Sequence, residues 1–320
     1  MEHILDKNFF PGWVRKAVTF TIDDGDILND KRFIDIVRPA GILGTFNLCA
    51  TDRASAEEYR ELYRGFEIAN HVRLHPRIFT QGVTYPLIDE VFDVSRADPS
   101  FFYRHPEIDG MYYFNIAYFS KSARYRENPE KWWRIITSPE VYIRLMDEAH
   151  ADLESVFGKG SVRSFVWPFG LQDDYEAVRE HVRAMGYYGA RDAGDPTDSF
   201  ELPRDRMNWV YNANDATLLD TMERFDALDE PELRIFSFGV HSVDYERAGR
   251  WGDLERFAEK YGNRPNDFYY ATVGDIFDYE DALASLEFDG REIRNPSSRT
   301  LFVKLDDEPI TLEPRSTYNI

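Results

Sequence analysis

Residues 18–26 of this chain read VTFTIDDGD, an apolar and β-rich run that ends in two adjacent carboxylates, Asp23 and Asp24, and a glycine. The run predicts a buried strand, and Gly25 allows the chain to turn sharply where that strand ends. In parallel α/β folds, the carboxyl ends of the strands face the ligand crevice. The two aspartates are therefore well placed for catalysis, although an Asp-Asp-Gly sequence after a strand is more often simple turn chemistry.

Other β-rich runs alternate with helical patterns along most of the chain, which indicates parallel βαβ units. We expect strands at residues 16–22, 42–48, 65–70, 163–168, 187–190, 234–241 and 267–272. Seven such strands suit a barrel. The predicted fold class is therefore α/β, with a barrel-like parallel sheet.

Helix signals lie between the expected strands. Ser55 is followed three residues later by Glu58, which is the pattern of a capping box. Ser138 begins a second helical pattern, which continues to Gly158. Two further helices are expected at residues 174–186 and 252–263.

Residues 77–137 interrupt this alternation. The segment holds 14 aromatic residues and is too long for an ordinary connection between two elements. Its aromatic residues include Phe101, Phe102, Tyr103, Tyr112, Tyr113, Trp132 and Trp133. We expect an insertion that is functional or forms an interface.

The pattern changes again after about residue 287. Residues 301–314 read LFVKLDDEPITLEP, in which two short alternating runs flank an acidic turn, and this predicts a β-hairpin. We therefore divide the chain into a barrel domain at residues 1–286, which includes the insertion, and a small β appendage at residues 287–320.

The charge balance limits the partners that we expect. The chain has 58 acidic and 38 basic residues, so its formal charge of −20 repels polyanions. Nucleic acid and anionic membranes are therefore not expected as partners. A neutral or cationic sugar polymer would be compatible, although acidity mostly reflects solubility and does not identify a ligand.

Cys49 is the only cysteine in the chain. Any metal must therefore be held by histidines and carboxylates, because no thiolate cluster can form. Residues 1–16 lack the apolar segment of a signal peptide, and no stretch approaches the ~20 apolar residues of a membrane span. We expect a cytoplasmic protein, although removal of an export signal would leave the same appearance.

A second polar element follows the expected strand at residues 65–70. It reads His71-Val-Arg-Leu-His75-Pro. Two imidazoles four residues apart can converge on one metal ion if the backbone makes a helical turn. With Asp24 as a third ligand, they would form a set of two histidines and one carboxylate that leaves positions open for water and substrate. The alternative is two polar loop histidines.

His241 ends the expected strand at residues 234–241. An ordinary imidazole pKa near ~6.5 allows it to give or take a proton at neutral pH, so it is a suitable general acid. A single histidine at a strand end is, however, more often structural.

These elements together resemble the motifs of the polysaccharide deacetylase family, which is the NodB-homology domain of carbohydrate esterase family 4. Residues 21–25 resemble the first motif, TFDDG, and residues 71–76 resemble the second, HxxxHP. Residues 165–170 resemble the third, and residues 238–242 resemble the fifth. The four motifs occur in the family's order, and the resemblance covers roughly residues 15–280.

The resemblance implies a distorted (β/α)7-type barrel that removes N- or O-acetyl groups from a carbohydrate substrate. It also implies a divalent ion, most often Zn²⁺, with Co²⁺, Mn²⁺ or Ni²⁺ as alternatives. Asp24, His71 and His75 would bind this ion. Asp23 would be the general base, and His241 would protonate the leaving group.

The third motif forms a turn in which the backbone N–H of Phe169 could stabilise an oxyanion beside Trp167. This motif departs from the family because Val166 stands where an arginine would orient the catalytic aspartate. The fourth motif has no clear match, and Arg191 and Trp209 are our candidates for its role. The alternative for Arg191 is a surface arginine that pairs with Asp192 or Asp195, or is simply solvated. In the second motif, Val72 replaces a Ser or Thr that braces the metal loop.

Two other functions remain open from the sequence. One is hydrolysis of another C–N bond, such as a cyclic imide or ureide, because a fold and metal site do not fix the substrate. The other is non-catalytic carbohydrate binding, which would not need a base beside a metal. The aromatic insertion could stack on sugar rings, or it could be buried in a homo-oligomer interface.

Overall fold

A parallel sheet forms the centre of the protein in the computed structural model, which describes residues 3–78, 102–115, 117, 129, 133–171 and 176–320. The strand order is β10, β9, β4, β3, β2, β11, and the short β12 pairs with β2. The strands are β2 (Lys16–Asp24), β3 (Thr45–Leu48), β4 (Glu67–Asn70), β9 (Val162–Val166), β10 (Gly189–Arg191), β11 (Arg234–His241) and β12 (Tyr269–Tyr270). Each of the seven predicted strand segments contributes to this sheet.

Residues 206–213 connect the two outer strands of the sheet. Trp209 forms a parallel bridge with Arg191 of β10, and Ala213 forms one with Phe238 of β11. The seventh predicted strand contributes only the two residues of β12. The predicted (β/α)7-type fold is confirmed, and its last gap is spanned by an irregular segment instead of a full strand.

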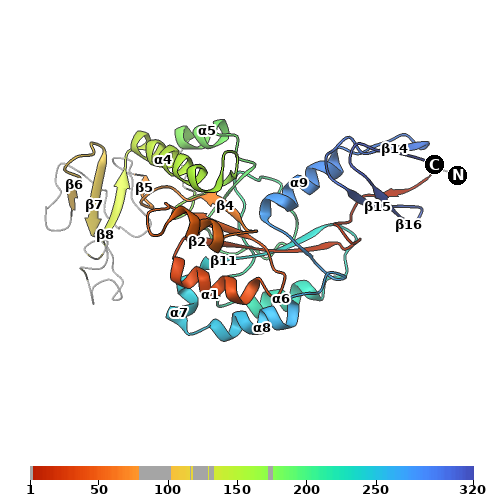
Figure 1. The fold of residues 1–320 in the computed structure, drawn as a ribbon, viewed down its shortest axis with the longest axis horizontal. Helices are drawn as coiled ribbons and strands as arrows, with labels where there is room; N and C mark the ends of the chain where they lie inside the picture. Colours follow the sequence, from red (N-terminus) through yellow and green to blue (C-terminus); the bar gives the residue numbers. More distant parts are fainter. Residues whose placement is uncertain (1–2, 79–101, 116, 118–128, 130–132, 172–175) are drawn as a thin grey trace.

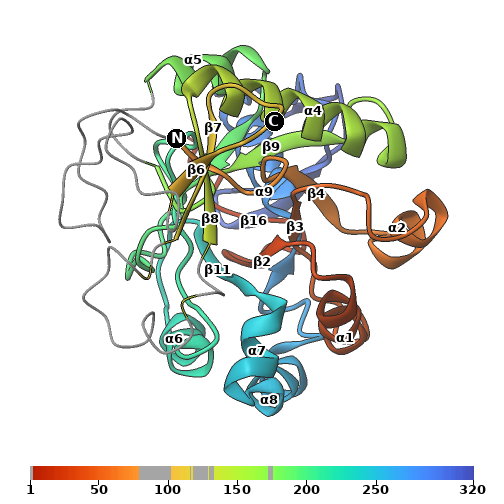
Figure 2. The ribbon, with the colours of Figure 1, turned by 90° about the vertical axis from the view of Figure 1, so that its left-hand side faces the viewer.

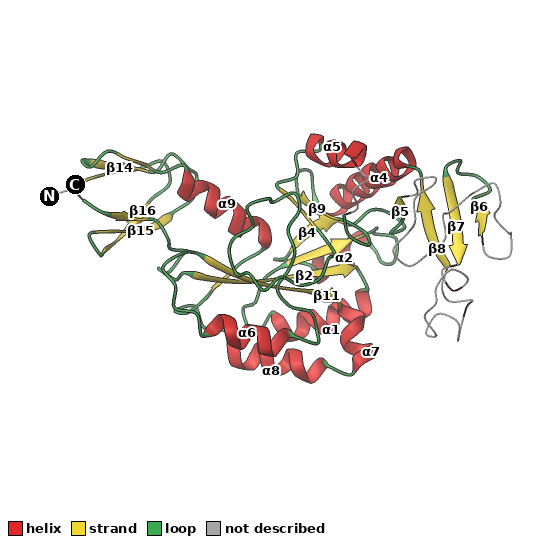
Figure 3. Cartoon of the chain, turned by 180° about the vertical axis from the view of Figure 1, so that it is seen from behind, coloured by secondary structure: helices red, strands yellow, loops and turns green. Residues whose placement is uncertain are grey.

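Helices cover the outside of the sheet (Figures 1 and 3). They are α1 (Ile27–Val37), α2 (Ala56–Leu62), α4 (Pro139–Phe157), α5 (Glu176–Ala184), α6 (Leu218–Asp226), α7 (Ser242–Ala248), α8 (Trp251–Tyr261) and α9 (Val273–Ala284). The predicted capping box of Ser55 and Glu58 is present, and Ser138 caps α4 as expected. Within the described ranges, no helix combines the length and the apolar character that a membrane span requires.

Buried aromatic rings join the sheet to the helices below it. Phe20 of β2 lies edge-on to Phe33 of α1, with 5.0 Å between ring centroids, and Phe238 of β11 lies 5.0 Å from Phe257 of α8. All four side chains are fully buried. Such contacts add about 0.5–1.5 kcal/mol each beyond burial. They anchor the two strands whose carboxyl ends carry Asp23 and His241.

The described part of the insertion forms a sheet of its own, with strand order β5, β8, β7, β6. Its strands are β5 (Arg77–Ile78), β6 (Phe102–Arg104), β7 (Met111–Asn115) and β8 (Trp133–Thr137). Figures 1 and 2 show this sheet beyond the end of the barrel at which β2 and β11 finish. Phe101 and Trp132 lie outside the described residues.

A small β appendage lies at the opposite end of the barrel (Figure 1). Its strands are β13 (Glu287–Phe288), β14 (Glu292–Arg294), β15 (Leu301–Leu305), β16 (Glu308–Leu312) and β17 (Thr317–Asn319). The predicted hairpin is confirmed by β15 and β16, which turn at Asp306 and Asp307 with φ values of 50° and 70°. The N-terminal strand β1 (Leu5–Asp6) pairs with β15. The boundary at residue 287 stays a prediction.

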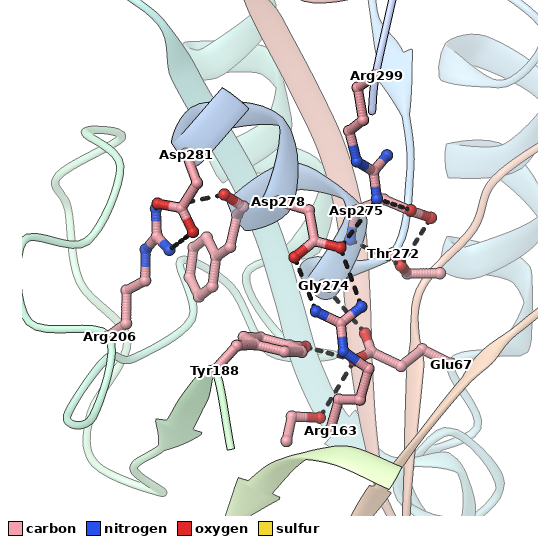
Figure 4. Close-up of polar contacts among 12 residues, drawn as sticks. Glu67, Arg163, Tyr188, Arg206, Thr272, Gly274, Asp275, Asp278, Asp281 and Arg299 are labelled. Atoms are coloured by element: carbon pink, nitrogen blue, oxygen red, sulfur yellow. Dashed lines mark hydrogen bonds and ion pairs between the residues drawn. The ribbon is translucent and has the colours of Figure 1, made fainter. Parts of the chain in front are cut away.

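Glu67 connects the start of β4 to α9 at this end of the barrel (Figure 4). Its carboxylate accepts hydrogen bonds from Thr45 Oγ1 at 2.7 Å, from Tyr188 Oη at 2.5 Å and from the backbone N–H of Gly274 at 3.0 Å. A carboxylate at a helix N-terminus is favourable because the first N–H groups of a helix lack partners within it. Glu67 therefore stabilises α9 against the strand starts.

Asp278 of α9 joins the barrel to the appendage (Figure 4). Arg163, at the start of β9, donates two hydrogen bonds to this carboxylate at 2.8 and 2.9 Å. Arg299, just before β15, donates to the same carboxylate at 2.9 Å and to Asp275 at 3.0 Å. One helix thus holds both parts of the molecule through paired charges.

Candidate metal centre

The carboxyl ends of the parallel strands surround a cavity of about 840 Å³. The predicted site residues that line it are Asp23, Asp24, His71, His75, Phe169, Arg191 and His241. The register of β2 and β11 places His241 directly opposite Asp23. Trp133 in β8 also lines the cavity, so the insertion sheet forms part of its wall.

Asp24, His71 and His75 form the candidate metal-binding set. The Nε2 atoms of His71 and His75 lie 3.5 and 3.6 Å from Asp24 Oδ1, and the three possible ligand atoms lie within 4.8 Å of one another. His71 Nε2 and Asp24 Oδ1 are buried and have no hydrogen-bond partner among the described residues. Buried polar atoms are normally paired, so this arrangement fits a cation bound between them.

The orientation of His71 and the protonation state of His75 also suit a metal ion. His71 Nδ1 lies 3.0 Å from the carbonyl oxygen of Val166, and because a carbonyl only accepts, Nδ1 is the donor and the opposite ring nitrogen, Nε2, is the atom directed towards Asp24. Burial and the neighbouring His71 lower the pKa of His75 to about 4, which keeps this imidazole neutral. The set therefore offers two imidazole nitrogens and a carboxylate, which are suitable ligands for a divalent transition metal.

The backbone between the two histidines differs from the predicted helical turn. Val72, Leu74 and His75 have positive φ values of 56°, 68° and 47°, and the His75 N–H donates to the Val72 carbonyl at 3.1 Å. The segment is a tight turn with left-handed residues. Such a backbone is unfavourable for residues other than glycine, above all for β-branched valine, and is typical of functional sites. The imidazoles converge through this turn and not through a helix.

Asn70, the last residue of β4, holds the turn in place. Its Oδ1 accepts the Val72 N–H at 2.9 Å, and its Nδ2 donates to the Met146 carbonyl at 2.9 Å and to Tyr187 Oη at 3.0 Å. The side chain of Val72 is fully buried in the core. Asn70 therefore braces the loop in which Val72 stands in place of the expected Ser or Thr.

Asp23 lies beside Arg191, the residue that we considered as an orienting cation. Arg191 Nη2 donates to Asp23 Oδ1, which also accepts from Asn47 Nδ2 at 2.7 Å. The Arg191 side chain is buried and its Nη1 donates to the backbone carbonyl of Asp192. Burial alone would raise the pKa of Asp23, but the charge of Arg191 leads the opposing effects that lower it. Asp23 is therefore ionised at neutral pH.

The position of Arg191 explains how the third motif can lack its arginine. Arg191 of β10 is paired in register with Val166 of β9, the position at which the family pattern has that residue. The guanidinium therefore comes from the adjacent strand. It lies 5.3 Å from the ring centroid of Tyr211, a cation–π contact that helps to hold it against Asp23.

His241 is oriented by Asp244, one helical turn further along the chain. His241 Nδ1 lies 2.8 Å from Asp244 Oδ2, and its Nε2 lies 3.6 Å from Asp24 Oδ2. Burial alone would lower the pKa of His241, but the hydrogen bond to Asp244 and the charges of Asp23 and Asp24 raise it to about 9. The imidazole therefore carries a proton that it can donate.

The predicted residues of the third and fourth motifs separate into two groups. Phe169 lines the cavity, has a φ of 61° and lies edge-on to His75 at 4.5 Å. Trp167 is buried against Phe165, and Trp209 is buried in the core cluster beneath α9. Neither tryptophan lines the cavity, because both side chains fill the core, so neither is placed to contact a substrate.

Sequence reasoning missed four residues that support this site: Asn47, Asn70, Tyr211 and Asp244. Asn47 and Asn70 are polar residues inside the short apolar strands TFNL and EIAN. A buried polar side chain needs a partner, so their positions were a usable signal. Asp244 follows His241 at helical spacing, which also could have been read. Tyr211 had no such signal.

Comparison with solved structures gives matches at low sequence identity. A CE4 esterase from Streptococcus mutans is 13% identical, with a TM-score of 0.44 over 81% of this chain and 86% of that one. A chitin deacetylase from Colletotrichum lindemuthianum is 14% identical, with a TM-score of 0.43 over 85% and 89% of the two chains. No curated protein matched the sequence.

The sequence profile of the polysaccharide deacetylase family matches residues 14–190, which is more than half of the 320-residue chain. The match spans the first three motifs and ends just before Arg191. It confirms the resemblance that the motifs indicated. The chain therefore belongs to the polysaccharide deacetylase family, enzymes that hydrolyse acetyl ester or amide bonds of carbohydrates.

Proposed function

We propose that this protein removes N- or O-acetyl groups from a carbohydrate with the help of one divalent ion held by Asp24, His71 and His75. The observation that carries the proposal is the pair of buried, unpartnered ligand atoms, His71 Nε2 and Asp24 Oδ1, beside an ionised Asp23. Zinc is the ion that we propose, and Co²⁺, Mn²⁺ or Ni²⁺ would suit the same ligands. When bound, such an ion lowers the pKa of a coordinated water and polarises the acetyl carbonyl.

Asp23 is the general base in this proposal. Within the described part of the chain, Asp23 accepts side-chain hydrogen bonds from Asn47 and Arg191, and both go to Oδ1, which leaves Oδ2 to accept a proton from water. Arg191 keeps the carboxylate ionised and fixes its orientation. A general base positioned in this way typically contributes 10²–10⁴-fold to the rate.

The departing sugar amine or alkoxide takes its proton from His241. Asp244 accepts from Nδ1 and so turns Nε2 towards the side of the cavity that holds Asp24. The raised pKa of His241 keeps the proton on the ring until the leaving group takes it.

The N–H of Phe169 is the chain's own candidate donor to the oxyanion. This N–H has no hydrogen-bond partner among the described residues, and the positive φ of Phe169 places it in a tight turn beside His75. One such donor is typically worth about 10²–10³-fold in kcat.

The test is metal analysis of the purified protein together with acetate release from a panel of acetylated oligosaccharides and small cyclic amides. The bound ion is exchanged for Zn²⁺, Co²⁺, Mn²⁺ and Ni²⁺ in turn, so that a wrong metal does not mimic inactivity. We expect about one ion per chain, and acetate release that a chelator abolishes and added metal restores. Turnover of a cyclic amide alone would assign the other hydrolase class.

The double variant His71→Ala/His75→Ala should lose both the ion and the activity, because one carboxylate cannot hold the ion that three ligands hold. His181→Ala is the matched control, since His181 pairs with Asp147 on the helical layer away from the cavity. A folded double variant that keeps stoichiometric metal would overturn the assignment.

A further inference from the structure

Four rings on the insertion sheet contact one another in sequence, and we call them the aromatic strip: Trp133, Tyr103, Tyr113 and His105. Trp133 and Tyr103 lie 5.3 Å apart between ring centroids, and Tyr103 stacks on Tyr113 at 4.9 Å with an interplanar angle of 24°. Tyr113 stacks on His105 at 5.7 Å and 25°. Each ring is thus held by the next, so little side-chain freedom remains to be lost when a ligand binds.

The strand register explains why these rings share one face. Tyr103 of β6 lies directly opposite Tyr113 of β7, and Trp133 of β8 lies opposite Asn115, two residues along from Tyr113. Residues two apart on a strand point to the same side of a sheet, so all of these side chains lie on one face. His105 lies two residues after Tyr103. On the other face Phe102 is buried and stacks on Tyr112, which fixes the sheet itself.

The aromatic strip runs from the catalytic cavity to the surface. Trp133 lines the cavity together with Asp23 and His241, whereas Tyr103 is 43% exposed. In Figures 1 and 2 the insertion sheet stands beyond the carboxyl ends of the barrel strands. The aromatic strip is therefore continuous with the proposed active site.

We propose that the aromatic strip binds the sugar units next to the one being deacetylated, so that this protein acts on oligomeric or polymeric carbohydrate in preference to a single acetylated sugar. This inference rests on the proposed function. Sugar rings present apolar C–H faces and polar edges. Tyr103 is exposed and Trp133 is half-buried, so these rings can offer apolar surface to a sugar while their polar groups remain hydrated.

A second copy of the chain is the other occupant that exposed aromatic rings can indicate. Continuity with the cavity favours the carbohydrate. A protein that covered the aromatic strip as far as Trp133 would also cover part of the cavity wall, and so would obstruct the entry of substrate.

The experiment compares kcat/KM for acetate release from N-acetylated chito-oligosaccharides and O-acetylated xylo-oligosaccharides, each from the single sugar to the hexamer. We expect the wild-type value to rise with chain length. Tyr103→Ala should lower it roughly tenfold for the longest oligomers, the loss expected for one stacking contact, and leave the single sugar and 4-nitrophenyl acetate unchanged. Tyr103→Phe should behave like the wild type.

Tyr318→Ala is the matched control, because Tyr318 is 42% exposed but lies on β17 in the appendage. The proposal is overturned if chain length has no effect, or if Tyr103→Ala lowers activity equally on all substrates. It is also overturned if Tyr103→Ala only converts a dimer to a monomer in sedimentation. Hexamer binding measured by calorimetry separates the two proposals. Binding that requires Tyr103 without acetate release from any substrate would overturn the proposed function but support the aromatic strip.

Discussion

The two ends of the barrel use the same kinds of charged residue in opposite ways. At the end shown in Figure 4, Asp278 accepts hydrogen bonds from both Arg163 and Arg299, and the charges are paired. At the other end, Asp24 Oδ1 and His71 Nε2 are buried and face each other without a hydrogen bond. Paired charges stabilise a structure, whereas unpaired ligand atoms are kept available for something that is bound.

The backbone shows the same difference. Half of the ten described non-glycine residues with positive φ lie around the cavity: Asp24, Val72, Leu74, His75 and Phe169. Such conformations cost of order 1–3 kcal/mol each and persist only where the surrounding structure imposes them. The aromatic core and the charge pairs at the opposite end stabilise the fold and so offset the cost of these backbone conformations.

The largest effects should come from single substitutions of Asp23 and Asp24, which are neighbours in sequence but have different proposed roles. Asp24→Asn should weaken metal binding and abolish activity, because an amide oxygen is a poorer ligand than a carboxylate. Asp23→Asn should keep the metal but lower kcat by 10²–10⁴-fold, since only the base is lost. Measuring the metal content and kcat of each purified variant distinguishes the metal ligand from the general base. Metal loss in Asp23→Asn with retention in Asp24→Asn would exchange the two roles.

His241→Ala should lower kcat by roughly 10²–10⁴-fold and leave metal content unchanged, because His241 is expected to supply a proton and not a ligand. The loss should be greater for acetylated amino sugars than for aryl acetates, whose leaving groups need little protonation. Rates on both substrate types measure this difference. Equal losses on the two would indicate a structural role.

The sequence was sufficient to predict which residues meet at the cavity. Asp23, Asp24, His71 and His241 each stand at or just after a strand end, and parallel strands bring their carboxyl ends to one edge. The same rule made Arg191 a candidate partner of Asp23, and the structure shows this contact in place of the alternative of a surface arginine. These predictions needed only the strand pattern and the order of the motifs.

What the sequence did not predict depends on contacts without a local pattern. Residues 206–213 join β10 to β11 by isolated bridges, so they carry no strand signal. Leu5 pairs with Leu305, although two residues of strand are too few to recognise. The orienting role considered for Trp209 stays a prediction. An aromatic residue near a strand end can face either the core or the cavity, and the side chain of Trp209 is buried in the core.

Asp30 differs from the carboxylates at both ends because it is buried without a cationic partner among the described residues. It accepts hydrogen bonds only from Tyr63 Oη and Ser242 Oγ, both at 2.6 Å. Burial raises the pKa of Asp30 to about 7, whereas the unfolded chain releases this proton near pH ~4. Between these pH values the folded protein holds a proton that the unfolded chain has already released. The free energy of unfolding should therefore fall as the pH rises from about 4 to about 7.

The titration of Asp30 should lower the free energy of unfolding by up to roughly 4 kcal/mol between about pH 4 and pH 7. Asp30→Asn removes the titrating group, so its free energy of unfolding should decline less over that range than the wild-type value. Urea denaturation of both proteins at several pH values measures the difference, in which all other titrations cancel. Parallel pH profiles would show that Asp30 is ionised in the folded protein.

The smallest effect should come from the opposite end of the barrel, where Asp278→Asn removes the charge shared by Arg163 and Arg299. This variant should lose roughly 1–2 kcal/mol of stability, since the hydrogen bonds are charge-assisted but the side chain is 25% exposed and therefore partly screened. Asp281→Asn, on the same helix but 66% exposed, is the matched control and should lose only a few tenths. Neither should change kcat or metal content, and added salt should reduce the difference between them. A fall in kcat with Asp278→Asn would mean that the two ends are coupled, and that pairing at one end serves the chemistry at the other.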